Sequence, residues 1–97
     1  MSVIRKYESI FIVAPQVEEE ARNQIIEKLK NLVESNGTLI KADEWGTRKL
    51  AYEVADQTEG YYVLFKFESS PEFPLELERI YKITDGILKF LVIKIDE

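Results

Sequence analysis

The order of the hydrophobic periodicities along the chain constrains its fold more than any single residue does. Runs rich in β-branched and aromatic residues, which predict strands, alternate with apolar stripes of three-to-four spacing, which predict amphipathic helices. Polar or glycine-containing turns separate these segments. The expected elements are a strand at 7–13, a helix at 17–33, strands at 38–54 and 61–68, a helix at 71–81 and a strand at 87–95.

Local residue types support several of these boundaries. Asn36-Gly37 is expected to end the first helix in a left-handed conformation, and Asp85-Gly86 is expected to end the second. Ser70-Pro71 has the residue types of an N-cap and a first helical position. Gly46 interrupts the second strand, where it indicates a bulge, and residues 56–60 form the expected polar turn between the middle strands.

One arrangement of the elements satisfies the connection rules for the resulting β-α-β-β-α-β order. Each β-α-β unit needs a right-handed crossover, and the two middle strands form a hairpin. These rules predict an α+β fold, the ferredoxin-like sandwich, in which a four-stranded antiparallel sheet carries two helices on one face. At 97 residues the chain has the length of one such domain, so we expect a single domain over residues 1–97.

The face of the sheet away from the helices is expected to be unusually apolar. Alternation within the return strand assigns Tyr61, Val63, Phe65 and Phe67 to the core. The opposite face is expected to carry Ile10, Ile12, Tyr62, Leu64, Leu91 and Ile93, edged by Lys66 and Lys89. Such a patch indicates a docking surface for a protein, unless a loop or the C-terminal tail covers it. The tail, Asp96-Glu97, is too short to do so.

The residue inventory argues against catalysis and against a cofactor. The chain has no cysteine and no histidine, which removes thiol chemistry, the commonest general base and the commonest transition-metal ligand. Its four glycines match no phosphate-binding loop, and its carboxylates fall on expected polar faces and turns. We therefore expect no enzyme activity, no metal, no cofactor and no small-molecule substrate.

The hydropathy of the chain places it away from membranes. No apolar stretch approaches the roughly 20 residues that a membrane-spanning helix needs. The first residues also lack the apolar run of a signal peptide. A cytoplasmic location is the expectation.

Basic residues are outnumbered by acidic ones, 13 to 18, but several of them are adjacent in the sequence. The formal net charge is −5, which disfavours coating by nucleic acid and leaves room for a local basic patch. Each cation alone is expected to be a solvated surface charge, but together on one edge of the sheet they could neutralise phosphates, with Trp45, Tyr52 or Tyr62 able to stack on bases. These cations are Arg5-Lys6, Arg48-Lys49, Lys66, Lys89 and Lys94. Gly60-Tyr61-Tyr62 resembles the RNA-recognition motif only loosely, because Glu59 stands where that motif has a cation.

Three segments together resemble a more specific family. They are Arg5-Lys6-Tyr7-Glu8 at the start, the run 45–54 with its glycine-x-arginine-x-leucine-alanine-tyrosine pattern, and Glu59-Gly60-Tyr61-Tyr62. Their order and spacing resemble the family of ribosomal protein six of the bacterial small subunit. The chain departs from the family at Glu53, where proline is common, and in lacking the long charged tail of some members.

The resemblance implies a structural role in the cytoplasmic ribosome. Members bind the central domain of small-subunit ribosomal RNA together with ribosomal protein eighteen, with which they form a heterodimer through the sheet. It implies RNA contact at Arg5, Lys6, Arg48 and Lys49, and partner contact at Tyr52, Tyr62, Leu64 and Leu91. The alternative is a self-associating regulatory or scaffold domain that dimerises through the open sheet face.

Overall fold

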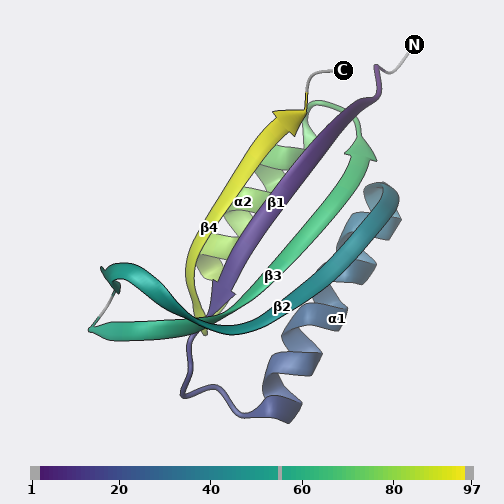
Figure 1. The fold of residues 1–97 in the computed structure, drawn as a ribbon. Helices are drawn as coiled ribbons and strands as arrows, with labels where there is room; N and C mark the ends of the chain where they lie inside the picture. The colour runs from purple at the N-terminus through teal and green to yellow at the C-terminus, as the bar shows by residue number, and fades with distance from the viewer. Residues whose placement is uncertain (1–2, 55, 96–97) are drawn as a thin grey trace.

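The computed structural model describes residues 3–54 and 56–95. Within these residues the four strands form one sheet in the order β2-β3-β1-β4, with every neighbouring pair antiparallel. Both helices lie on the same face of the sheet (Figure 1), which confirms the predicted ferredoxin-like sandwich. The elements are β1 (Arg5–Val13), α1 (Glu19–Asn36), β2 (Gly37–Val54), β3 (Gln57–Ser69), α2 (Phe73–Ile83) and β4 (Ile87–Ile95).

The core lies between the sheet and the helices, and aromatic rings dominate it. Phe11 on the central strand β1 packs edge-on against Phe65, with 5.3 Å between ring centroids, and lies 5.2 Å from Tyr81 of α2. Alternation in β3 works as predicted, because Val63, Phe65 and Phe67 are fully buried. The helices contribute the buried side chains of Ile26, Leu29, Val33, Phe73, Leu77 and Tyr81.

A pair of hydroxyl groups is buried inside this apolar core. Ser9 Oγ of β1 and Tyr81 Oη of α2 are 2.5 Å apart and form a hydrogen bond. Ser9 and Tyr81 are both almost completely buried. Burial raises the pKa of the Tyr81 phenol well above its usual value of 10.0, and the hydrogen bond from Ser9 opposes this rise only in part.

The raised pKa of Tyr81 predicts a loss of stability in alkaline solution. The unfolded chain releases the phenolic proton near pH 10, while the folded protein holds it to higher pH. The stabilisation is therefore complete below about pH 10 and decreases as the pH rises above that value. Tyr81→Phe should flatten this decrease, and should cost about 1–3 kcal/mol at neutral pH because it leaves the Ser9 hydroxyl unpaired.

Urea unfolding of both proteins between pH 7 and 11 measures the two effects. The double variant Ser9→Ala/Tyr81→Phe is the control, since it removes both hydroxyls and should recover part of the neutral-pH loss. If the free energy of unfolding decreases equally steeply above pH 10 in Tyr81→Phe and in the parent chain, Tyr81 is not the source of the alkaline loss of stability.

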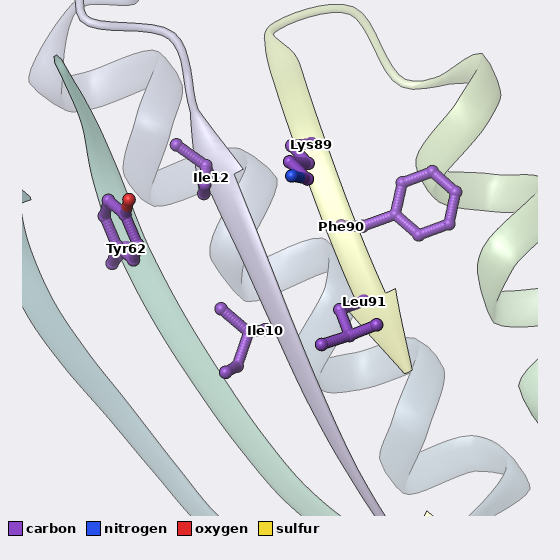
Figure 2. Close-up of a pocket in the computed structure, with 6 residues that line it drawn as sticks. All are labelled: Ile10, Ile12, Tyr62, Lys89, Phe90 and Leu91. Atoms are coloured by element: carbon purple, nitrogen blue, oxygen red, sulfur yellow. The ribbon is translucent and has the colours of Figure 1, made fainter. Parts of the chain in front are cut away.

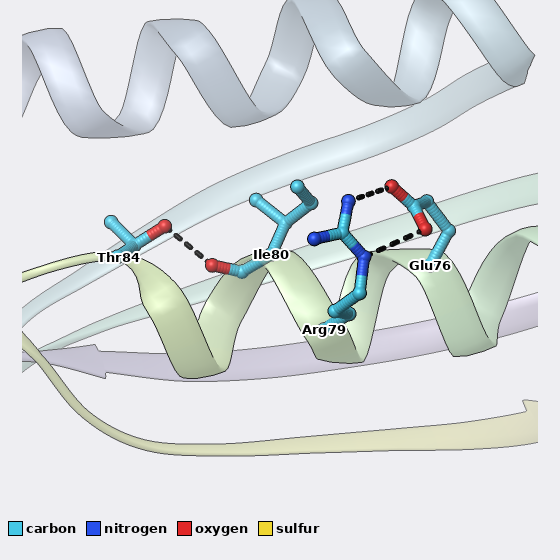
Figure 3. A network of polar contacts seen from close by, with 4 residues as sticks. All are labelled: Glu76, Arg79, Ile80 and Thr84. Atoms are coloured by element: carbon cyan, nitrogen blue, oxygen red, sulfur yellow. Dashed lines mark hydrogen bonds and ion pairs between the residues drawn. The ribbon is translucent and has the colours of Figure 1, made fainter.

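The ends of α2 are stabilised by local polar contacts (Figure 3). Arg79 donates two hydrogen bonds to Glu76 one turn earlier, at 3.0 and 2.5 Å. These bonds favour the carboxylate and lower the pKa of Glu76. At the other end, the Thr84 hydroxyl donates to the carbonyl of Ile80 at 2.5 Å, which satisfies one of the carbonyls left open at a helix C-terminus.

Two predicted helix boundaries are wrong in detail. Gly37 is not left-handed: its φ is 179°, and it continues directly into β2. Glycine is needed there for space, because a Cβ atom would lie 2.0 Å from the carbonyl oxygen of Glu68. Ser70 is not the N-cap of α2 either, since the helix begins at Phe73 and its preceding residue, Glu72, makes no side-chain cap.

The hairpin between β2 and β3 is longer than predicted. Strand β3 begins at Gln57, so most of the expected polar turn 56–60 is part of the strand. Gly46 has φ of 86° at a register shift between Glu44 and Gly46, which confirms the predicted bulge. The two strands therefore continue beyond the last paired residue of β1, Val13, and project past the end of the sheet (Figure 1).

Candidate protein and nucleic-acid interface

The register of the sheet sorts the open face, which is the face away from the helices, into rows that cross the strands. Residues directly opposite one another in an antiparallel pair share a face. Counted from the end of β1, the rows on β3, β1 and β4 are Tyr62, Ile12 and Lys89; Leu64, Ile10 and Leu91; Lys66, Glu8 and Ile93; and Glu68, Lys6 and Ile95. The first two rows make an apolar half of the open face, and the last two make a charged half.

The apolar half contains a shallow pocket of about 210 Å³ (Figure 2). Ile10, Ile12, Tyr62, Lys89 and Leu91 point to the same side of the sheet around it, whereas Phe90 points away toward α2. The pocket continues onto an exposed edge, because Leu91 is 55% and Ile93 is 44% exposed. Ile12 is mostly covered by its neighbours and forms the floor of the pocket rather than its rim. Leu64, in the same apolar half, is also mostly covered and does not line the pocket.

Aromatic and cationic side chains flank the pocket on the β2 side. Trp45 stacks on Tyr62 with 6.3 Å between ring centroids and 15° between ring planes. The guanidinium carbon of Arg48 lies 5.3 Å from the Trp45 ring centroid, within the range of a cation–π contact. Arg48, predicted to contact RNA, therefore lies on the same face as Tyr62, predicted to contact the partner.

The end of the hairpin curls back toward β4. We call residues 50–54 and 56–59 the distal arm. Lys89 of β4 donates a hydrogen bond to the Tyr52 hydroxyl of this arm, and its ammonium lies 4.6 Å from the Tyr52 ring centroid. The arm thereby encloses a second pocket of about 90 Å³. It is lined by Leu50, Ala51, Tyr52 and Val54 of the arm and by Ile12, Tyr62 and Lys89 of the sheet.

The four predicted RNA-contacting residues do not form one cluster. Arg5 pairs with Ser69 and Arg48 pairs with Gly60, and these partners are nine residues apart along β3. At about 3.3 Å per residue, the two basic pairs are separated by about 30 Å. Lys49, which pairs with Glu59, also points to the opposite face from Arg48, because successive strand residues alternate.

A contact cluster on the helix side of the hairpin was not predicted from the sequence. The Arg22 guanidinium of α1 lies 3.9 Å from the centroid of the Tyr61 ring, and the Tyr61 hydroxyl donates to Glu44 at 2.7 Å. Burial and the hydrogen bond to Glu44 raise the pKa of Tyr61. This cluster ties α1 to the bulged part of the hairpin. No spacing in the sequence indicates it, because its members come from three separate elements.

The described part of the chain offers little for other kinds of chemistry. Among residues 3–54 and 56–95, no group of three acidic side chains is placed to hold a metal ion. In the same residues, no helix has the length and apolarity to cross a membrane. A sheet backed by two helices, with an apolar pocket flanked by cations and aromatic rings, defines a binding protein of the ferredoxin-like class.

Comparison with known proteins identifies the family. The family model described as Ribosomal protein S6 matches residues 6–94. Small ribosomal subunit protein bS6 of Caldanaerobacter subterraneus subsp. tengcongensis is 50% identical, over 97% of this chain and all of the relative. The protein of the same name from Clostridium perfringens is 50% identical, over 94% and 97% of the two chains. The crystal structure of 30S ribosomal protein S6 from Thermotoga maritima is 35% identical and superposes with a TM-score of 0.90, covering 96% and 89%.

The chain belongs to the ribosomal protein S6 family. It is a structural protein of the small subunit of the cytoplasmic ribosome, and not an enzyme. The resemblance carried by residues 5–8, 45–54 and 59–62 is thereby confirmed.

Proposed function

We propose that this chain binds the RNA of the small ribosomal subunit jointly with ribosomal protein eighteen, which docks on the open face of the sheet. The observation that carries the proposal is the apolar half of that face. Within it, Leu91 is exposed at the edge of a pocket walled by Ile10 and Tyr62, and the exposed Ile93 of the next row extends the apolar surface along β4. A contiguous apolar surface of this kind marks a site of protein association.

The charge of the chain supports a joint rather than an independent mode of RNA binding. The formal net charge is −5 and the isoelectric point is near 4.8, so the field of the whole protein repels phosphates. Two local cations neutralise too few phosphates for strong binding at physiological salt. A basic partner on the open face supplies the missing positive charge and makes RNA binding a property of the pair.

The basic residues at the two ends of the sheet have different surroundings. Arg48 lies beside Trp45 at the edge of the proposed protein interface, whereas Arg5 begins β1 at the far end. An RNA that contacts both ends has to run along the sheet for about 30 Å. We propose Arg5, Lys6, Arg48 and Lys49 as RNA contacts of the assembled pair, and Tyr52, Tyr62, Leu64 and Leu91 as partner contacts.

Replacing the hairpin cations tests the RNA assignment. The variant Arg48→Ala/Lys49→Ala, assayed by filter binding in the presence of ribosomal protein eighteen, should bind central-domain RNA about three- to tenfold more weakly. The slope of log affinity against log salt should become shallower by about 1–2, since each lost phosphate contact contributes about 0.9.

Two further variants make this result specific. Arg5→Ala/Lys6→Ala, in the same assay, measures how much the two cations at the opposite end of the sheet contribute to RNA affinity. Lys28→Ala/Lys30→Ala, on α1, is the matched control and should leave the affinity and the salt slope unchanged. An unchanged slope in Arg48→Ala/Lys49→Ala would remove the hairpin pair from the RNA site.

The oligomeric state separates this proposal from the alternative of a self-associating scaffold. Sedimentation at micromolar concentration should give a monomer for the chain alone and a heterodimer after addition of ribosomal protein eighteen. A stable homodimer that excludes the second protein would favour self-association through the same face.

A further inference from the structure

We propose that Lys89 is a positioning residue, which fastens the distal arm across the end of the open face and completes the docking groove before a partner arrives. The inference rests on the proposed function for its biological role, but its physical basis lies in the free protein. It concerns the contact between Lys89 and Tyr52 and the two pockets that share Lys89.

The topology makes the contact between these two residues unexpected. Tyr52 belongs to β2 and Lys89 to β4, which are the two outer strands of the sheet, with β3 and β1 between them. Three strand spacings separate the outer strands by about 14 Å, too far for direct contact within a regular sheet. The two side chains meet because the hairpin continues past Val13 and curls over the end of β1.

Lys89 contacts Tyr52 at the hydroxyl end of the aromatic side chain and lies close to its ring. Its ammonium donates a hydrogen bond to the phenolic oxygen and lies 4.6 Å from the ring centroid. Tyr52 is 61% exposed, so apolar burial contributes little to holding it in place. The cation therefore attracts Tyr52 to this position, in addition to the packing of the half-buried Leu50 and Val54 of the arm.

The position of the arm determines the shape of the docking groove. The larger pocket and the arm-enclosed pocket share Ile12, Tyr62 and Lys89 as lining residues. The two pockets are therefore adjacent, and we call them together the docking groove. A two-stranded ribbon without further packing is marginally stable in water, so an unfastened arm leaves the second half of the groove open. A preformed groove lowers the ordering cost of binding.

Hydrogen exchange in the free protein tests the fastening without any partner. In Lys89→Met, which keeps the unbranched apolar stem and removes the cation, amides of the distal arm should exchange about two- to fivefold faster, as expected for an exposed cation–π contact. Amides of the central strand, such as those of Phe11 and Ile12, should keep their rates. Lys89→Arg, which retains a cation, should restore slow exchange in the arm. Unchanged arm exchange in Lys89→Met would overturn the proposal.

Binding of ribosomal protein eighteen tests the consequence by a double-mutant cycle. Lys89→Met and Tyr52→Leu should each weaken binding by up to about fivefold, and their combination should be no worse than the stronger single variant. If the two substitutions weaken binding independently, so that their fold-changes in affinity multiply in the double variant, the positioning role of Lys89 is overturned. If arm exchange responds as expected but the parent chain does not bind the second protein, the fastening stands and the proposed function fails.

Discussion

The substitution Leu91→Asp is expected to weaken binding of ribosomal protein eighteen by at least about 30-fold, equivalent to about 2 kcal/mol. Leu91 is 55% exposed in the free protein and lies in the apolar row with Ile10 and Leu64. Docking on this face takes the side chain out of water. An aspartate at this place removes the apolar contact of the leucine and puts a carboxylate between Ile10 and the docked protein, where it loses hydration, which is costly. Isothermal titration calorimetry measures the change in affinity.

The matched control for this experiment is Leu75→Asp. Leu75 is 72% exposed on α2, so the same change of side chain is made on the helix side of the molecule. This variant should bind the second protein as the parent does. Equal losses in both variants, or no loss in Leu91→Asp, would contradict docking on the open face.

The largest expected effect on stability belongs to Phe11→Ala, which should lower the free energy of unfolding by about 3–5 kcal/mol. Phe11 is fully buried on the central strand and contacts the rings of Phe65 and Tyr81. Its removal leaves a cavity that neighbouring strands on both sides cannot easily fill, because interiors are close-packed. Urea unfolding followed by circular dichroism gives the free energy.

Ile83→Ala provides the comparison for this loss. Ile83 is exposed at the last residue of α2, so an alanine there should change stability by less than about 1 kcal/mol. A similarly small change in Phe11→Ala would show that the aromatic core does not dominate the stability of the fold.

The sequence predicted the elements that depend on hydrophobic periodicity. The alternation in β3, the apolar stripe of α2 and the bulge at Gly46 are local patterns, and each appears where its residues indicate. The open face was predicted for the same reason, since Tyr62 and Leu64 alternate with the core residue Val63. These features can be predicted from the directions in which successive side chains of one strand or helix point.

Features that depend on contacts between distant segments were not predictable from local patterns. Gly37 was expected to provide a left-handed stop, but it is required by the close approach of the Glu68 carbonyl from β3. The contact between Lys89 and Tyr52 depends on the curl of the distal arm, which no propensity specifies. Both are tertiary effects that override local preference.

The separation of Arg5 from Arg48, unlike these contacts, could have been predicted, because it follows from the predicted order and direction of the strands. Strands β1 and β3 are antiparallel, so the start of β1 pairs with the end of β3. The tip of the β2–β3 hairpin lies at the start of β3 and therefore at the other end of the sheet. Treating all basic residues as one patch overlooked this consequence of the strand order.

Titration of the isotopically labelled chain with unlabelled ribosomal protein eighteen, followed by nuclear magnetic resonance, tests the central claim most directly. The account predicts that the largest changes fall on the apolar half of the open face, at Ile10, Ile12, Tyr62, Leu64 and Leu91, and that they saturate at a one-to-one ratio. Changes confined to α1 and α2, with the open face unaffected, would contradict it.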